Sequence, residues 1–118
     1  MNDLTIHTRT APSGPVLELT GGLDHVTSPR VRAHLLHLSL LPGQLLVVDL
    51  GAVAFCDSSG ISALIAARNH ALQAGASIAL AAVPSRIDRI FHVVGLEAVF
   101  PTHPTAQAAT DAWTPPAV

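Results

Sequence analysis

Residues 45–61 read LLVVDLGAVAFCDSSGI and join the pattern of a buried strand to the start of a helix. The run at 45–50 is almost continuously apolar, which is typical of a parallel strand that is covered on both faces. A polar turn at 57–60 follows, and apolar residues at helical spacing begin at Ile61. Ligands gather at the carboxyl ends of parallel strands, so we expect this turn to lie at the functional edge of the sheet.

The chain after this turn predicts a helix, a strand and a second helix. Gly75 is placed to close the first helix, because glycine accepts the left-handed backbone of a helix end. An apolar strand is expected at 77–83, and a further helix opens at Pro84 and ends at Gly95. The apolar residues at helical spacing are Ile61, Leu64, Ile65 and Leu72 in the first helix, and Ile87, Ile90, Phe91 and Val94 in the second.

Two weaker elements are expected at the end of the chain. Val99 and Phe100 predict a short edge strand, and the alanines at 105–113 favour a last helix with a weak apolar stripe. Residues 114–118 have the composition of a frayed tail.

The residues before 45 predict an opening hairpin and one helix. Apolar and polar residues alternate at 4–8 and again around 17–19, and a turn cluster, PSGP, separates them at 12–15. Ser28-Pro29 has the pattern of an N-cap followed by proline at the first helical position. We therefore expect a helix from about Pro29 to Ser39.

Together these elements predict an α/β fold with a mixed β-sheet. The antiparallel opening hairpin is followed by parallel strand-helix-strand units with right-handed crossovers, and about four helices cover the sheet. The length of 118 residues fits a single domain at 1–113, followed by the tail.

The composition argues against several classes of protein. Hydrophobic residues make up 49% of the chain, so a disordered protein is not expected, and no apolar run approaches the roughly 20 residues that span a bilayer. The first residues lack the pattern of a secretory signal. We therefore expect a cytoplasmic protein that does not associate with membranes.

The charges argue against a nucleic-acid partner. All six basic residues are arginines, scattered from Arg9 to Arg89, and the formal net charge is −2. A phosphate backbone would find no basic stripe, and an aromatic content of 3% offers few platforms for stacking bases.

Cysteine and histidine do not predict a metal site or another cofactor. The lone Cys56 cannot form an internal disulfide, and its place at the end of an apolar run predicts a small core hydrophobe. His34 and His37 share an i, i+3 spacing, but no Cys, Asp or Glu supplies a third ligand at a recognisable spacing.

The turn at 57–60 has several interpretations that its residues leave open. Asp and Ser are ordinary helix N-caps. The free N–H groups and the macrodipole of a helix N-terminus also favour an anion such as phosphate. As a nucleophile, Ser58 or Ser59 would need a histidine base such as His70 or His92, and the Gly-x-Ser-x-Gly elbow of serine hydrolases is absent.

The turn is better suited to receive a phosphoryl group than to transfer one. The phosphate-binding loop of P-loop enzymes does not occur, and the chain contains no lysine. A phosphoserine would add roughly −1.5 to −2 of charge, which a helix N-terminus tolerates. The fold would survive, while a partner would meet a dianion beside Asp57.

The stretch at 46–96 resembles the STAS family and, more narrowly, the bacterial anti-anti-sigma factors, which are anti-sigma factor antagonists. The resemblance rests on Asp57-Ser58-Ser59-Gly60-Ile61, on Gly75, and on the segment RIFHVVGL at 89–96. The segment at 21–29 is also similar to the one that precedes the first helix in that family.

The resemblance implies regulation by partner switching. An unphosphorylated antagonist binds an anti-sigma factor serine kinase, so that the sigma factor is released. Phosphorylation by that kinase ends the association, and a phosphatase resets the cycle. Ser58 matches the serine that is phosphorylated in the family, and Ser59 is the second choice. The resemblance implies a protein without catalytic residues, which acts as a monomer or weak dimer.

The resemblance also implies a docking surface with five members: Asp24, Asp57, Ser59, Gly60 and Ile61. Three of them have a structural alternative. Asp24 would cap the loop before the first helix, Gly60 would serve the backbone geometry alone, and Ile61 would belong to the core.

Two positions depart from the commonest family pattern. Gly22 stands where an acidic residue often precedes Leu-Asp, which leaves the identity of the partner open, and Cys56 stands where a larger apolar residue is usual. Two other functions remain as alternatives. One is a STAS scaffold or subunit of a larger signalling or transport assembly that is never phosphorylated, and the other is a small serine-dependent hydrolase.

Overall fold

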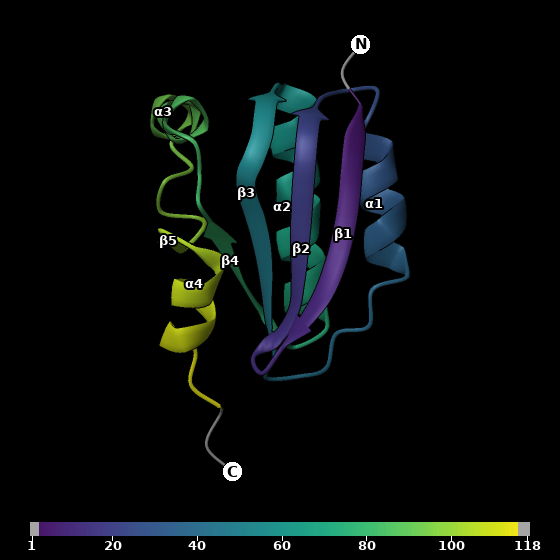
Figure 1. Ribbon diagram of the computed structural model, residues 1–118, viewed down its shortest axis with the longest axis vertical. Coiled ribbons are helices and arrows are strands. Elements are labelled where there is room, and N and C mark those ends of the chain that lie inside the picture. Colours follow the sequence, from purple (N-terminus) through teal and green to yellow (C-terminus); the bar gives the residue numbers. More distant parts are fainter. Residues whose placement is uncertain (1–2, 116–118) are drawn as a thin grey trace.

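The computed structural model describes residues 3–115, and within them the chain forms one α/β domain (Figure 1). The strands lie in the sheet in the order in which they occur in the chain, β1-β2-β3-β4-β5. The elements are β1 (Leu4–Ala11), β2 (Gly14–Leu23), α1 (Ser28–Leu36), β3 (Leu45–Cys56), α2 (Ser58–Gln73), β4 (Ser77–Ala81), α3 (Ser85–Val94), β5 (Thr102–His103) and α4 (Ala106–Ala112).

The sheet is mixed, as predicted. β1 and β2 form an antiparallel hairpin, whereas β2, β3, β4 and β5 pair in parallel. The carboxyl ends of β2 and β3 therefore lie together, at the top of Figure 1. The predicted α/β fold class is confirmed.

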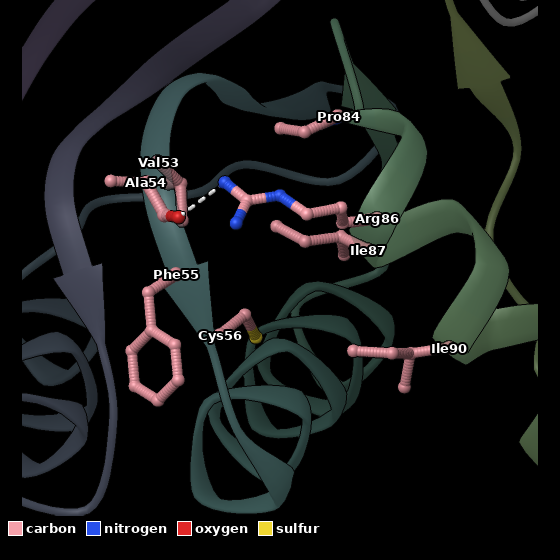
Figure 2. A pocket seen from close by; sticks show the side chains of 8 residues that line it. All are labelled: Val53, Ala54, Phe55, Cys56, Pro84, Arg86, Ile87 and Ile90. Atoms are coloured by element: carbon pink, nitrogen blue, oxygen red, sulfur yellow. Dashed lines mark hydrogen bonds between the residues drawn. The ribbon is translucent and has the colours of Figure 1, made fainter.

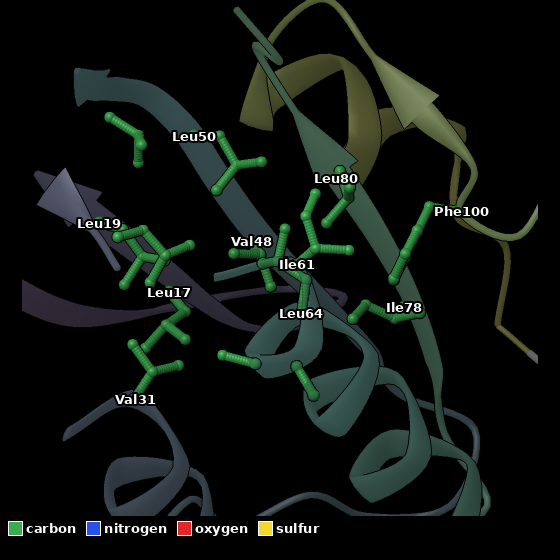
Figure 3. Close-up of a cluster of buried hydrophobic side chains, with 14 of the residues drawn as sticks. Leu17, Leu19, Val31, Val48, Leu50, Ile61, Leu64, Ile78, Leu80 and Phe100 are labelled. Atoms are coloured by element: carbon green, nitrogen blue, oxygen red, sulfur yellow. The ribbon is translucent and has the colours of Figure 1, made fainter. Parts of the chain in front are cut away.

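Two layers of helix enclose the sheet. α1 and α2 cover one face, where they bury leucine, isoleucine and valine side chains of β2, β3 and β4 (Figure 3). α4 packs on the opposite face, where Ala106 and Ala109 contact a smaller cluster that includes Val47 and Ala79. At the end of α4, the Trp113 indole donates a hydrogen bond of 3.2 Å to the Gly43 carbonyl. Burial of these apolar faces is the main force that holds the layers together.

Leu72 was predicted on the inner face of α2, which is wrong, and Val94, which shares the apolar spacing of α3, is also exposed. Leu72 is 50% exposed and Val94 is 56% exposed. Leu72 follows the buried Ala71 by one residue, which turns it about 100° away from the core. Val94 continues from Ile90 at i, i+4 along the side of α3, whereas the core-facing pair of that helix is Ile87 and Phe91.

The predicted strand at Val99 and Phe100 is wrong, because the fifth strand is Thr102–His103. The Phe100 side chain is buried and stacks on Phe91 with a centroid distance of 5.8 Å, so its apolar character reflects core packing. Pairing with β4 begins later, where the Leu80 N–H donates to the Pro101 carbonyl.

Other boundaries differ by two or three residues. α1 begins at Ser28, so that Thr27 and not Ser28 is its N-cap, and it ends at Leu36, not at Ser39. α2 begins at Ser58, ahead of Ile61. β4 ends at Ala81, not at Val83, because Ala82 adopts a left-handed backbone with a φ of 53°. The helix expected at 105–113 is present as α4. The tail predicted at 114–118 lies outside the described residues from 116 onward.

Candidate functional site

Ser58 is the first residue of α2, directly after the carboxyl end of β3, and it is exposed. Asp57 is the N-cap, with an extended backbone, and its Oδ1 accepts a hydrogen bond of 3.0 Å from the Gly60 N–H. The Asp57 carbonyl accepts the first helical hydrogen bond, from the Ile61 N–H, at 3.0 Å. The N-cap interpretation of this turn is therefore confirmed, and the cap fixes a hydroxyl at the positive end of the helix.

The loop after β2 lies beside this turn. The Leu23 carbonyl accepts a hydrogen bond of 3.2 Å from the Asp57 N–H, which ties the ends of β2 and β3 together. Asp24 follows at once, and its Oδ1 accepts hydrogen bonds from the N–H groups of Val26 and Thr27, at 2.9 and 3.0 Å. Asp24 therefore caps its own loop, as its structural alternative predicted.

Asp24 stays ionised at neutral pH. The hydrogen bond from the Thr27 N–H, aided by that from Val26, holds the pKa of the Asp24 carboxyl below its usual value. A fixed negative charge therefore lies on the loop next to Ser58.

Gly60 lies where the two loops approach each other. A Cβ at this position would lie 2.5 Å from the Leu23 carbonyl oxygen and 2.7 Å from the Cys56 sulfur, so no side chain fits. Gly60 and Ile61 are both buried. Of the residues predicted to form the docking surface, Asp24, Asp57 and Ser59 are partly exposed, whereas Gly60 and Ile61 lie beneath them.

An apolar groove opens beside Ser58, between the start of α2 and the last turn of α3. It has a volume of about 360 Å³ and includes Ser58, Ile61, Ile90, Val94 and Leu96. Sequence reasoning missed this groove. Val94 was recognised only as part of the apolar stripe of α3, and spacing shows which residues share a stripe of a helix, not how far the sheet covers that stripe.

Two further exposed apolar residues flank the same end of the sheet. Val26 lies on the loop after β2, and Phe55 lies near the end of β3. Neither was predicted, although both occur within segments that resemble the STAS family. Large exposed apolar side chains that gather around a polar centre are typical of protein interaction sites.

A smaller hollow of about 210 Å³ lies between β3 and α3 (Figure 2). β4 ends opposite Asp49, so the last part of β3 has no strand on that side. Arg86 reaches across from α3 and donates a hydrogen bond of 2.7 Å from Nη2 to the Ala54 carbonyl. Ile90 lines both this hollow and the groove beside Ser58, so α3 shapes the two together.

Cys56 lies at the base of this hollow and is buried, as predicted for a small core hydrophobe. Burial, together with the nearby charge of Asp57, raises the pKa of the Cys56 thiol to about 11. The thiol therefore stays protonated near neutral pH, which makes it a poor nucleophile.

The two histidines considered as a catalytic base, His70 and His92, make other contacts or lie at another part of the fold. Within residues 3–115, no histidine is hydrogen-bonded to Ser58 or Ser59. His70 lies in the last turn of α2, at the other end of the helix. His92 is 3.6 Å from Asp88 and 4.0 Å from Glu97. Among the described residues, neither Ser58 nor Ser59 therefore forms the serine–histidine hydrogen bond that activates a nucleophile.

The described part of the chain has no group of three metal-ligating side chains that could hold a metal ion. His34, one of the two spaced histidines, instead contacts β1, with its Nε2 at 2.7 Å from the Thr8 Oγ1.

Comparison with known proteins identifies the family. Residues 6–101 match the family model described as "Mlab, STAS domain". The chain belongs to the STAS domain family. The resemblance that the sequence motifs carry is therefore confirmed. No helix among residues 3–115 of this STAS domain is long and apolar enough to cross a membrane.

Two proteins similar to this STAS domain are described as anti-sigma factor antagonists. An anti-sigma-B factor antagonist from Listeria monocytogenes is 28% identical over 78 residues, which cover 66% of this chain and 68% of that protein. The crystal structure of an anti-sigma factor antagonist from Mycobacterium paratuberculosis is 25% identical, with a TM-score of 0.78 over 94% of both chains.

A STAS domain protein from Planctomyces limnophilus, also described as an anti-sigma-factor antagonist, has a TM-score of 0.82 at 19% identity. The match covers 92% of this chain and 97% of that one. At this level of identity the likeness establishes the fold alone.

Proposed function

We propose that this STAS domain is an anti-sigma factor antagonist, which binds an anti-sigma factor through the surface around Ser58 and so releases a sigma factor. Support comes from its named relatives in Listeria monocytogenes and Mycobacterium paratuberculosis. The observation that carries the proposal is the position of Ser58, exposed at the N-terminus of α2 and on the rim of an apolar groove.

In this proposal the anti-sigma factor is a serine kinase, and Ser58 is the residue that it phosphorylates. Ser58 is exposed, whereas Ser59 is half-buried, so a kinase reaches the Ser58 hydroxyl more easily. A phosphate on Ser58 would lie at the positive end of the α2 dipole, which tolerates its charge of roughly −1.5 to −2. The antagonist therefore keeps its fold when it is phosphorylated.

Phosphorylation ends the association through charge and desolvation. The partner packs on the groove formed by Ile90, Val94 and Leu96, and on the neighbouring carboxylates of Asp24 and Asp57. A dianion at the rim of that groove must lose water when a partner covers it, and an unpaired buried charge is costly. Acidic groups of the partner are also repelled. A phosphatase then restores binding.

The five predicted docking residues divide into two roles. Asp24, Asp57 and Ser59 contact the partner at the surface. Gly60 and Ile61 act from beneath, because Gly60 allows the close approach of the two loops and Ile61 forms the floor of the groove. The protein itself contributes no catalytic residue, and it works in the cytoplasm as a monomer or weak dimer.

Phosphosite mapping tests this proposal. The parent protein and the variants Ser58→Ala and Ser59→Ala are each incubated with ATP and lysate from the native host, and mass spectrometry locates the phosphate. We expect phosphate on Ser58 in the parent and in Ser59→Ala, and none in Ser58→Ala. A parallel pull-down should recover an ATP-binding anti-sigma protein.

Phosphate on Ser59 alone would move the switch by one residue. A stable bound assembly without phosphate on either serine would contradict the switch and favour the scaffold function. Labelling of the folded protein by a serine-reactive probe would favour the hydrolase.

A further inference from the structure

The two helices that cover the core, α1 and α2, carry positive charge and no carboxylate. The chain has no Asp or Glu at 25–48 or at 58–87, whereas Arg30, Arg32 and Arg68 lie on these helices. His34 and His70 lie in their last turns. Because the whole chain has a net charge of −2, the positive charge is segregated onto this layer.

A second groove runs between these two helices. It has a volume of about 320 Å³, and its walls include Arg32 and Leu36 of α1 and Asn69, His70 and Gln73 of α2. His70 follows Ser58 by twelve residues, which places it about 18 Å farther along the helix. This α1–α2 groove is therefore separate from the groove beside Ser58.

The fold does not account for the side chains on the α1 wall of this groove. Leu36 is 78% exposed. It therefore occupies a position at which an amphipathic helix usually carries a polar residue. Arg30 forms an ion pair with Asp3 at 2.9 Å, but Arg32 makes no ion pair within residues 3–115. Arg32 and Leu36 are four residues apart, so they lie on one side of α1. A cation and a large apolar side chain thus line the same groove with no internal partner for the charge.

We propose that the α1–α2 groove binds an acidic amphipathic helix of a partner protein. A groove between two helices accepts the ridge of a third helix, and such complexes use apolar anchors at helical spacing. Leu36 contacts the apolar face of the bound helix. Arg32 attracts the carboxylates of the bound helix, and His70 offers a ring nitrogen for hydrogen bonding. The bound carboxylates meet no repulsion from α1 or α2, because these two helices contain no Asp or Glu.

This surface goes beyond the proposed antagonist function, because it leaves Ser58 free. A partner on the α1–α2 groove and an anti-sigma factor at Ser58 contact opposite ends of α2, so both can bind at the same time. The domain then connects two proteins, and phosphorylation controls only one of the two contacts.

The test uses the full chain and a defined probe, a fluorescein-labelled helical peptide with leucines along one face and glutamates along the other. Fluorescence anisotropy measures its affinity, and ¹⁵N–¹H NMR spectra locate it. We expect the peptide to shift the amide signals of Arg32, Leu36 and His70, and to bind less tightly as salt is raised. A matched peptide with glutamine in place of glutamate should bind much more weakly.

Matched variants separate this groove from the general surface. Arg32→Glu and Leu36→Ser should each weaken binding of the acidic peptide by about tenfold. Arg89→Glu makes the same charge reversal, and Val93→Ser a comparable apolar-to-polar change, at exposed positions of α3, and both should leave the affinity unchanged. Ser58→Glu should also bind the peptide like the parent.

Four results would overturn the proposal. They are the absence of binding, equal loss in the α3 variants, equal affinity for the glutamine peptide, and amide shifts that cluster around Ser58. Binding of anionic phosphatidylglycerol vesicles through Arg32, without peptide binding, would assign the surface to a membrane. Self-association of the parent that Leu36→Ser abolishes, without peptide binding, would assign it to a second copy of this chain.

Discussion

α1 and α2 both begin with a serine that follows a parallel strand and a short loop, yet the two serines differ in accessibility. Ser28 is the first residue of α1 and is only 5% exposed, whereas Ser58, the first residue of α2, is exposed. The preceding caps differ as well. Asp57 caps α2 through its side chain, while Thr27, the N-cap of α1, makes no such bond and instead donates its hydroxyl to the Gly22 carbonyl.

The comparison shows that a helix N-terminus with a hydroxyl is not by itself a site. The α1 N-terminus is closed off by the loop before it, because the Thr27 N–H donates to the Asp24 carboxylate and the Thr27 hydroxyl donates to the Gly22 carbonyl of β2. The α2 N-terminus is open and adjoins an apolar groove. Accessibility to a kinase and to a partner separates Ser58 from Ser28, and that property depends on the tertiary structure.

The largest difference is expected when the same substitution is made at both serines. Ser28→Glu places a carboxylate in a buried position and should lower the free energy of unfolding by at least about 2 kcal/mol. Ser58→Glu places it at an exposed helix N-terminus, where it should change stability by less than about 1 kcal/mol, in the stabilising direction. Urea denaturation of both variants measures the difference, and equal losses would contradict the assigned burial of Ser28.

A second pair of variants tests the contact between the two loops. Gly60→Ala should lower the free energy of unfolding by about 1–3 kcal/mol, because the methyl group would meet the Leu23 carbonyl at 2.5 Å. Gly95→Ala is the control. Gly95 has a φ of 76°, which favours glycine, but nothing lies within 4 Å of the added carbon, whereas at Gly60 the constraint is the close contact alone. Gly95→Ala should lower the free energy of unfolding by about 1 kcal/mol.

Thermal unfolding monitored by circular dichroism compares these two glycine variants. If Gly60→Ala is as stable as the parent while Gly95→Ala loses stability, the close approach of the loops is not a constraint, and Gly60 has no structural role at the site.

The smallest effect concerns Asp24 and pH. Its pKa is lower in the folded protein than its ordinary value of 3.8, so its ionised form stabilises the fold above that value. This contribution is lost as the pH falls through the lower, folded-state pKa. Asp24→Asn should therefore be less stable than the parent near neutral pH, and the gap should close at acidic pH. A gap in urea midpoints that stays constant down to about pH 2.5 would contradict the assigned shift.

The sequence predicted those features of the site that depend on local chemistry. Asp57 and Ser58 form a cap motif within a few residues, and Gly75 and Gly95 end their helices with a left-handed backbone. The mixed sheet followed from the order of strand and helix patterns. The apolar stripe of α3 was also recognised from its helical spacing.

The remaining features depend on contacts between distant parts of the chain. Gly60 of α2 is required by the close approach of Leu23 at the end of β2, and no local sequence pattern predicts a contact between these two elements. Val94 is exposed although it continues the apolar stripe of α3, because the core-facing residues of that helix are Ile87 and Phe91. Spacing along a helix does not contain this information, so both grooves were found only in the structure.

The central claim is that a negative charge on Ser58 controls binding of an anti-sigma factor. The most direct test is a calorimetric titration of the purified anti-sigma factor with the unphosphorylated protein, the protein phosphorylated on Ser58, and Ser58→Ala. We expect the unphosphorylated parent and Ser58→Ala to bind with similar affinity, and the phosphorylated form to bind at least about tenfold more weakly. Equal affinity of the phosphorylated and unphosphorylated forms would contradict the account.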